Sequence, residues 1–171
     1  MKYLIISDIH GSCECMKKMI DNINYEKPNN IIVLGDIFSY GYSSDSALID
    51  ILNKMKDKLI VIRGNCDKKI NDVLCDFKFY DNLMIEYNNK KIFLTHGHIY
   101  NMDSLPDINF DIMLHGHFHM HYIKKYDNKI FASPGSISIP RNNSENSYMV
   151  IENNKIILKN LDRNIILEEE I

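Results

Sequence analysis

Three short apolar runs, each followed at once by polar residues, set the pattern of the first part of the chain. They span residues 3–7, 31–34 and 59–62, and compact runs of this kind are typical of strands buried on both faces. Strand, polar loop and helix in succession predict right-handed crossovers and a parallel sheet. The three polar loops are therefore expected at one edge of that sheet.

Two helices are predicted between these strands. The first has Ser12 as its N-cap and ends before Pro28, because a serine side chain accepts a hydrogen bond from the first turn and proline interrupts a helix. Its apolar residues recur at helical spacing: Cys15, Met16, Met19, Ile20 and Ile23. The second helix carries Ala47, Leu48, Ile51, Leu52 and Met55, with Ser43, Ser44 and Asp45 as candidate caps.

From about Phe77 the pattern changes to short strands around asparagine-rich turns, which predict β-hairpins. The predicted pairs are 83–87 with 92–95, 122–126 with 130–132, and 148–151 with 156–158. Single strands are expected at 112–114 and 165–167, and Glu168–Glu170 is expected to be a solvated end. The second half is thus predicted to be mostly antiparallel. The whole order favours one domain over residues 1–171, a four-layer α/β/β/α sandwich of two mixed sheets.

Composition limits the classes of function. Of the 171 residues, 45% are hydrophobic and 25% are charged, and the formal net charge is -3. This balance is typical of a soluble globular domain, and it argues against a protein that tracks extended nucleic acid. The four cysteines, Cys13, Cys15, Cys66 and Cys75, lack zinc-finger spacing and are interpreted as reduced thiols. We expect no membrane span and a cytoplasmic location.

Histidines are concentrated in one region, since six of the seven lie between His96 and His121. In an extended backbone, residues two apart point to the same side, so His117 and His119 are predicted to present two imidazoles to one spot. Gly116 allows a sharp turn or a close approach to another group. Taken alone, this stretch fits a solvent-facing edge equally well, because short histidine tracts are only suggestive of metal.

Further potential metal ligands follow the predicted strands. Asp8 and His10 come after the first strand, Asp36 after the second and Asn65 after the third, and α/β folds bind ligands just beyond the carboxyl ends of such strands. A single aspartate at such a place often caps the next helix instead. The joint occurrence favours one metal site with seven donors: Asp8, His10, Asp36, Asn65, His96, His117 and His119.

The chemistry of these donors narrows the choice of ion and reaction. Imidazole and carboxylate together favour manganese, iron, zinc, cobalt or nickel over magnesium or calcium. Seven protein ligands exceed the needs of one ion and serve two ions if one carboxylate bridges them. Two ions about 3.5–4 Å apart stabilise in-line displacement at phosphorus and lower the pKa of a shared water. The donor set therefore predicts a binuclear phosphoester hydrolase.

Five ordered blocks of the sequence resemble the calcineurin-like metallophosphoesterases. They are Asp8-x-His10, Gly35-Asp36, Gly64-Asn65-Cys66-Asp67, Thr95-His96-Gly97-His98 and Gly116-His117-Phe118-His119. The short chain, the Asn-Cys-Asp form of the third block and the stretch Ser133–Ser136 are similar to the small bacterial and archaeal phosphodiesterases of the YfcE type. The match extends from Tyr3 to about Pro140.

The resemblance implies a role for each ligand. One ion would take Asp8, His10 and His119, the other would take Asn65, His96 and His117, and Asp36 would bridge them. The resemblance also implies a bridging hydroxide as the nucleophile and manganese as the working ion, with nickel, iron, zinc or cobalt as alternatives. Asp36 and Asn65 would thus act in catalysis with the metals. His115 and His121 fall outside the family's ligand positions.

Four other residues have two possible roles each, one in substrate binding or catalysis and one that is only structural. Many relatives have histidine at Cys66, where it is thought to assist phosphate binding or leaving-group departure. A neutral thiol is a weak donor, so slow turnover with a preference for aryl over alkyl diesters is expected, unless Cys66 only packs beside the site. His98 is a possible substrate contact or a hydrogen-bonding partner of a neighbouring loop. Tyr40 and Tyr42 would stack on a base or aryl group, or cover the core.

The function expected from these features is metal-dependent hydrolysis of small phosphodiesters. A phosphomonoesterase is the nearest alternative, and a scaffold that keeps the fold for binding other proteins is the rival from another class. The intact set of ligand positions argues against the scaffold. An exposed β edge would permit a homodimer or homotetramer.

Overall fold

The computed structural model describes residues 1–39, 46–69 and 71–171. The predicted caps Ser43, Ser44 and Asp45 and the two loop tyrosines, Tyr40 and Tyr42, lie outside the described residues. The helices are α1 (Cys13–Glu26), α2 (Ser46–Asn53) and the short α3 (Asn71–Leu74), with a 3-10 turn η1 at Lys56–Lys58. No helix within the described ranges is long and apolar enough to cross a membrane.

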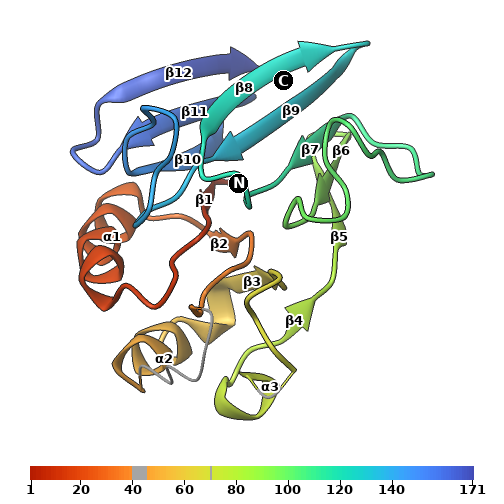
Figure 1. Cartoon of the computed structure of the whole chain (residues 1–171). Coiled ribbons are helices and arrows are strands. Elements are labelled where there is room, and N and C mark those ends of the chain that lie inside the picture. Colours follow the sequence, from red (N-terminus) through yellow and green to blue (C-terminus); the bar gives the residue numbers. More distant parts are fainter. Residues whose placement is uncertain (40–45, 70) are drawn as a thin grey trace.

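The strands form two sheets (Figure 1). The seven-stranded sheet, in spatial order, contains β12 (Ile165–Glu170), β11 (Lys155–Asn160), β10 (Ser147–Glu152), β1 (Tyr3–Ile6), β2 (Asn30–Val33), β3 (Leu59–Ile62) and β4 (Phe79–Tyr80). The five-stranded sheet contains β5 (Leu83–Tyr87), β6 (Lys90–Leu94), β7 (Ile112–Leu114), β9 (Lys129–Pro134) and β8 (His121–Tyr126). The expected α/β sandwich of two mixed sheets is confirmed.

The parallel part of each sheet positions the loops that matter here. Strands β1, β2 and β3 are parallel, as predicted, and the two-residue β4 extends this run. In the second sheet β6, β7 and β9 are parallel, although the pattern had favoured antiparallel pairing in this half. Because parallel strands end at the same edge, the segments after β6 and β7 emerge together.

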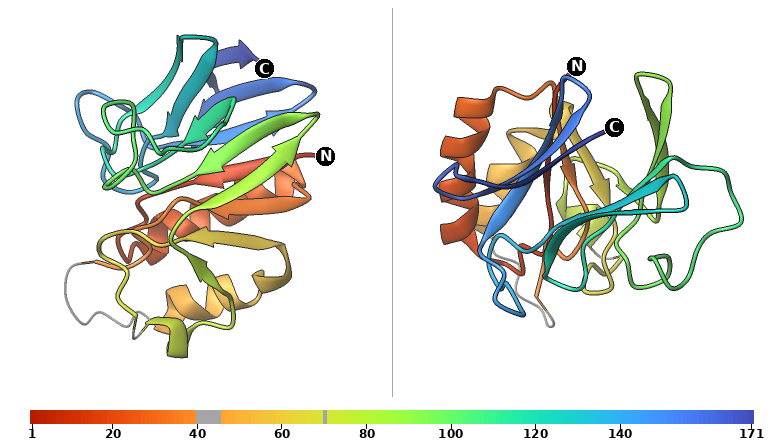
Figure 2. Two further views of the ribbon diagram at one scale, coloured as in Figure 1. Left: turned by 90° about the vertical axis from the view of Figure 1, so that its right-hand side faces the viewer. Right: turned by 90° about the horizontal axis from the view of Figure 1, so that it is seen from above.

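Three apolar clusters define the layers. Leu4, Ile6 and Val33 face α1 and α2 on one side of the first sheet, and Ile5 and Ile32 face the second sheet across the central core. The view from above in Figure 2 shows this order of helices, first sheet and second sheet. The outer face of the second sheet carries a third cluster: Phe93, Phe110, Met113 and Phe131.

The layer outside the second sheet differs from the helical layer that was expected. Residues 99–111 contain no helix and contribute Tyr100, Met102 and Phe110 to the third cluster. A loop therefore covers the face of the second sheet where the four-layer arrangement had a helical layer.

Local features follow the sequence closely. The Ser12 side chain accepts a hydrogen bond from the Cys15 N–H (3.3 Å), and α1 ends at Glu26, where Lys27 forms the C-cap with a left-handed backbone, φ 50°. The predicted hairpins are confirmed, and each turns on a pair of left-handed residues: Asn88 and Asn89, Asp127 and Asn128, Asn153 and Asn154. Such pairs make the tight turn that suits the twist of two antiparallel strands.

The acidic end of the chain is only partly as predicted. Glu168 and Glu170 are exposed to solvent, but Glu168–Glu170 belongs to β12, which was expected to end at residue 167. Glu168 pairs with Lys155 Nζ at 3.1 Å, and Glu169 pairs with Lys125 Nζ of β8 at 2.7 Å. The ion pairs on the neighbouring strand and on the facing sheet allow an acidic segment to extend the sheet.

Candidate metal centre

The loops at the carboxyl ends of five strands meet at one place. Asp8 and His10 follow β1, Asp36 follows β2, and Asn65 follows β3. His96 follows β6, and His117 and His119 follow β7. Backbone hydrogen bonds join these loops: the His10 N–H donates to the Asp36 carbonyl (2.9 Å), and the Gly116 N–H donates to the His96 carbonyl (2.8 Å).

Two glycines allow the loops to approach so closely. A Cβ on Gly64 would collide with the Asp36 carboxylate, and a Cβ on Gly116 would collide with the Ser7 hydroxyl and crowd Asp8 Oδ2. The close approach expected at Gly116 is therefore present, and Gly64 has the same role in the first sheet. The His117 N–H then reaches Asp8 Oδ2 at 3.0 Å, which joins the two sheets at the site.

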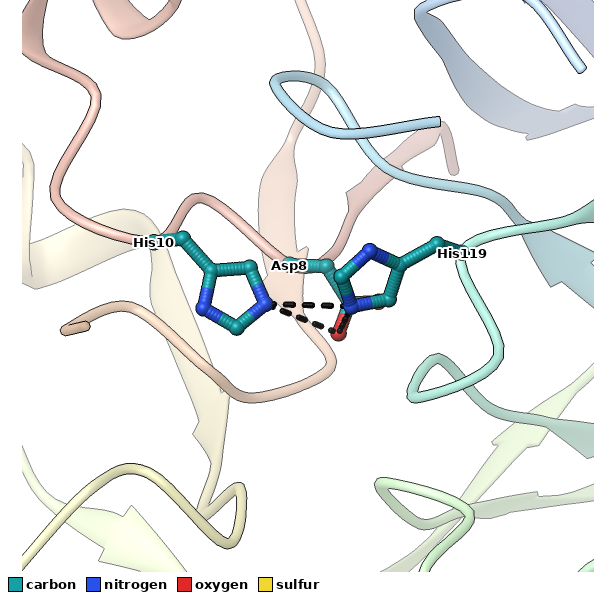
Figure 3. A group of neighbouring side chains, drawn as sticks. All are labelled: Asp8, His10 and His119. Atoms are coloured by element: carbon teal, nitrogen blue, oxygen red, sulfur yellow. Dashed lines mark hydrogen bonds and ion pairs between the residues drawn. The ribbon is translucent and has the colours of Figure 1, made fainter. Parts of the chain in front are cut away.

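The first group of donors consists of Asp8, His10 and His119 (Figure 3). His119 Nε2 lies 3.1 Å from His10 Nε2 and 3.3 Å from Asp8 Oδ1, and His10 Nε2 lies 3.9 Å from the same oxygen. The three side chains come from two loops more than one hundred residues apart in sequence and point toward one another.

The second group consists of Asp36, His96 and His117, whose donor atoms lie within 4.8 Å of one another. Asn65 Oδ1 lies 3.1 Å from His96 Nε2, so the amide joins this group. The Asp36 carboxylate stands between the two groups, because its Oδ1 is 3.4 Å from His96 Nε2 and its Oδ2 is 3.7 Å from His10 Nε2. The structure thus brings all seven predicted donors together.

Two backbone carbonyls fix the orientation of the histidine rings. His96 Nδ1 donates to the Leu34 carbonyl and His119 Nδ1 donates to the Ile139 carbonyl, both at 2.7 Å. Each ring therefore directs Nε2 toward the centre, and a hydrogen bond of this kind at the outer nitrogen fixes the tautomer of a metal-binding histidine.

The donors fit a divalent cation. Asp8 Oδ1 is buried and has no hydrogen-bond partner within the described part of the chain, and a buried carboxylate oxygen without a partner is costly. The Nε2 atoms of His10 and His119 face each other at 3.1 Å. A positive charge between these atoms would satisfy all of them at once, and imidazole with carboxylate is a donor set of borderline transition metals.

Burial and mutual charge effects shift the pKa values of several of the donors. Burial opposes ionisation of Asp36, but its interactions with His96 and the Cys66 N–H dominate and hold its pKa well below the usual range. Burial likewise opposes protonation of His96, yet Asp36 raises its pKa. Asp8 raises the pKa of His119, whereas burial lowers the pKa of His10 and His117. The site is therefore built around the anionic Asp36 carboxylate.

The backbone at the site differs from the prediction. Five donors lie in the left-handed region, with φ of 54° at Asp8, 47° at His10, 52° at Asp36, 72° at His117 and 59° at His119. The expectation of an extended His117-x-His119 stretch that serves one spot was wrong. Because both residues turn, His117 joins the Asp36 and His96 group and His119 joins the Asp8 and His10 group.

The possible substrate contacts lie around these donors. The His98 ring is 5.3 Å from the His96 ring and 6.2 Å from the His117 ring, and it lines a cleft of about 150 Å³ with Arg63 and Tyr100. Burial lowers the pKa of His98. Cys66 is buried, its Sγ lies 3.2 Å from Asp36 Oδ2, and its N–H donates to Asp36 Oδ1 at 2.8 Å.

The two histidines outside the donor set have other partners. His115 is fully buried, and its Nε2 is hydrogen-bonded to the Tyr122 hydroxyl while its Nδ1 donates to the Gly116 carbonyl. His121 Nδ1 lies 3.3 Å from Ser147 Oγ. Both support the segment around the site without reaching the donors.

Several residues support the donors through hydrogen bonds whose partners the sequence does not reveal. Asp67 is buried and accepts hydrogen bonds from the Phe38 N–H (3.1 Å) and the Gly64 N–H (2.9 Å), so it ties the loop after β2 to the loop after β3. Ser136 Oγ and Ser138 Oγ donate to the Asp8 carbonyl at 2.7 Å and 2.9 Å. Asp67 and Ser136 stand in noted motifs, but nothing in the sequence shows which loops they join.

Comparison with known proteins places this fold and site in a family. Residues 1–155 match the calcineurin-like phosphoesterase superfamily domain, and the chain belongs to that superfamily. It is 28% identical over 164 residues to phosphodiesterase YfcE of Escherichia coli K12, covering 90% of this chain and 88% of that protein. It is 26% identical over 144 residues to phosphodiesterase MJ0936 of Methanocaldococcus jannaschii, covering 79% and 83%.

Solved structures agree with this assignment. The structure of the E. coli phosphoesterase YfcE superposes with a TM-score of 0.93 at 27% identity over 99% of both chains. A zinc complex of Vps29 from Entamoeba histolytica superposes with a TM-score of 0.70 at 22% identity over 100% of this chain and 98% of that one. At this level of identity the second likeness extends to the fold alone.

Proposed function

We propose that this protein is a metal-dependent phosphodiesterase that hydrolyses small phosphodiesters. Two relatives that cover most of the chain, from E. coli and M. jannaschii, are phosphodiesterases by name. The carboxylate, amide and imidazole donors at the strand ends supply the type of site that such a reaction uses.

Two ions are proposed, one on each group of donors. Asp8, His10 and His119 would hold the first ion, and Asn65, His96 and His117 would hold the second, with Asp36 between them. Manganese is the expected ion, with nickel, iron, zinc and cobalt as alternatives. When bound, the ions would supply the positive charge that makes a water nucleophilic near neutral pH and that stabilises in-line displacement at phosphorus.

The residues of the chain prepare the site for this chemistry. Asp36 remains anionic because His96 and the Cys66 N–H hold its pKa far below the usual range. The carbonyls of Leu34 and Ile139 hold His96 and His119 in fixed orientations. We propose that Asn65 also donates to a phosphate oxygen and that His98, at the neighbouring cleft, contacts the substrate. Charges that are fixed before the substrate binds need no reorganisation during the reaction.

The position of Asp36 carries the proposal, because its two oxygens face the two groups of donors. An Asp36→Asn variant tests it. The amide loses one anionic oxygen, so bound metal should fall below two ions per chain and the rate on an aryl phosphodiester should fall by roughly 100-fold or more. Elemental analysis of the purified protein and the hydrolysis rate are the measurements. A variant with full metal content and full rate would refute the bridging role.

The same assay separates the competing readings. Rates on paired mono- and diesters of one leaving group would identify a phosphomonoesterase, and metal-loaded protein without activity on either ester would favour a scaffold that binds other proteins.

We propose no extended nucleic acid as substrate, since the net charge is -3 and strand tracking needs many basic contacts. We also propose a homodimer or homotetramer, which light scattering of the purified protein would test.

A further inference from the structure

The thiol of Cys66 lies against the carboxylate that stands between the two groups of donors. Its Sγ is 3.2 Å from Asp36 Oδ2, and that oxygen is the one that faces His10, with His10 Nε2 at 3.7 Å. The other oxygen, Oδ1, faces His96 at 3.4 Å and accepts the Cys66 N–H. The sulfur therefore lies beside the carboxylate oxygen that faces the first group of donors, and it also accepts a hydrogen bond from Asn65 Nδ2 at 3.6 Å.

His10, Asp36 and Cys66 form a third group of side chains that could hold a metal ion. One donor atom from each of the three lies within 4.8 Å of the other two. His10 and Asp36 each belong to one of the donor groups described above, so the sulfur adds a donor to an existing site and does not create a remote one. All three side chains are buried or half-buried.

A second observation points to a cation at this position. Asp8 Oδ1 is fully buried without a hydrogen-bond partner in the described ranges. It lies 3.9 Å from His10 Nε2, the nitrogen that also belongs to the group with Cys66. An ion bound by His10 Nε2 and Asp36 Oδ2 would therefore also lie close to Asp8 Oδ1 and to the Cys66 sulfur.

We infer that the Cys66 sulfur is an additional ligand of the ion held by Asp8, His10 and His119, and that it makes this position selective for thiophilic ions such as zinc and cobalt. The second position, with the Asn65 oxygen and two imidazoles, has no sulfur donor among the described residues and suits manganese. This inference rests on the proposed two-ion site and adds to it a difference between the two positions. Soft thiolate ligands select zinc over manganese, whereas oxygen donors suit manganese.

The binding step balances without any oxidant or reductant. Cysteine coordinates metal as a thiolate, so the S–H bond breaks, a sulfur–metal bond forms, and the proton leaves to solvent. Asp36 Oδ2 then loses the thiol as a hydrogen-bond partner and gains the ion in its place. A zinc–sulfur bond of about 2.3 Å is the ordinary length for such a ligand.

Cobalt provides a direct test, because a cobalt–thiolate bond has a charge-transfer absorption in the near ultraviolet that nitrogen and oxygen ligands do not give. Apoprotein loaded with cobalt should show this band together with the visible cobalt bands. A Cys66→Ser variant should keep two cobalt ions per chain and the visible bands but lose the charge-transfer band. A Cys75→Ser variant is the control, because Cys75 is a buried free thiol outside the three donor groups, and it should keep the band.

The outcomes separate this inference from the proposed function. Wild-type protein that binds two cobalt ions without the charge-transfer band would overturn the sulfur ligand and leave the two-ion site standing. Wild-type protein that binds no cobalt, manganese or zinc would overturn the two-ion site itself. The wild-type spectrum decides the question even if a cysteine variant fails to fold.

Competition between ions gives a second readout. Removal of the sulfur should weaken zinc binding by roughly 10- to 100-fold and leave manganese binding within about threefold, because only the soft ligand is lost. Titration of wild-type, Cys66→Ser and Cys66→Ala proteins with zinc against manganese measures the ratio. An unchanged ratio in both variants would contradict the inference.

Discussion

Asp67 shows how a single side chain sets the distance between two loops. Its carboxylate accepts the N–H groups of Phe38 and Gly64, each within two residues of a proposed ligand. Burial raises its pKa in spite of these donors. The Asp67 carboxylate is thus buried away from water, and the N–H groups of Phe38 and Gly64 are its main hydrogen-bond partners. These two N–H groups in turn use the carboxylate as their acceptor.

An Asp67→Asn variant tests this connection. An asparagine side chain has one acceptor oxygen, so one backbone N–H loses its partner, and we expect the free energy of unfolding to fall by about 1–3 kcal/mol. Because the loops of Asp36 and Asn65 would separate, the metal affinity should fall by roughly 10- to 100-fold. Thermal unfolding and metal titration are the measurements. Asp76→Asn is the control, since Asp76 is exposed and pairs only loosely with Lys56; equal effects in both variants would remove the proposed role.

Cys66 leads to a kinetic prediction at the same scale. A Cys66→His variant places a group that can carry positive charge beside Asp36, so a leaving group that is a poor acid should gain more help than one that is already acidic. We expect the rate on an alkyl phosphodiester to rise by roughly 10-fold or more and the rate on an aryl diester to rise less. Paired kcat measurements give the result, and unchanged rates on both substrates would show that Cys66 has no influence on the leaving group.

The end of α1 contains a buried charge cluster that belongs to the fold. Glu26 accepts from Lys159 Nζ at 2.6 Å, Lys2 Nζ at 2.5 Å and the Tyr148 hydroxyl at 3.1 Å. Its side chain is 2% exposed. Burial opposes its ionisation, yet the hydrogen bonds from Lys159 and Lys2 lower its pKa below the ordinary value of 4.5. The cluster connects the helix to β10 and β11 and to the first residues of the chain.

Stability should depend on this cluster and on pH. The pKa of Glu26 is lower in the folded than in the unfolded protein, so its contribution is complete above the unfolded value of 4.5 and is lost as the pH falls through the folded value. We expect Glu26→Gln to lose about 2 kcal/mol at neutral pH, because two lysines keep their burial but lose an anionic partner. Urea unfolding across this pH range measures the effect, and a difference that stays constant into strong acid would contradict it.

Helices and strands with a clear pattern of hydrophobic residues were predictable from the sequence. Strand pairings that depend on contacts between residues far apart in the sequence were not. Strand β3 was predicted residue for residue, because four consecutive apolar residues are bounded by polar ones. Strand β4 has two residues, too few to form any pattern. The parallel pairing of β7 with β9 was missed because β8 folds back on β9 in a hairpin and leaves the other edge of β9 for β7. A hairpin turn is encoded by neighbouring residues, but the strand that pairs with the free edge of the hairpin is determined by contacts far apart in the sequence.

At the scale of the whole molecule, the site joins the two sheets. Asp8, Asp36 and Asn65 come from the first sheet, and His96, His117 and His119 come from the second. The motif blocks located these residues, since each block follows a strand of recognisable pattern. Their division into two groups was implied by the family resemblance alone, because it depends on how the sheets pack and on left-handed backbone conformations that the hydrophobic pattern does not indicate.

Ion binding should therefore stabilise the whole fold. A ligand that binds only the folded state adds about 2.7 kcal/mol when its free concentration is 100 times its dissociation constant. We expect the unfolding temperature to rise as manganese or zinc is added and to fall when a chelator removes them. Calorimetry over a metal series measures the rise, with Asp36→Asn as a variant whose curve should be much flatter. A wild-type unfolding temperature that does not change with metal concentration would indicate that ion binding at the site does not stabilise the packing of the two sheets.

The left-handed conformation of five donors has a consequence for how such a chain changes over generations. Each non-glycine residue held in this way costs about 1 kcal/mol or more, so Asp8, His10, Asp36, His117 and His119 together keep the fold below the stability it could reach. Selection for hydrolysis preserves that cost. Once selection for activity is relaxed, substitutions that remove these donors can raise the stability of the protein. The fold would then persist in descendants that no longer catalyse the reaction.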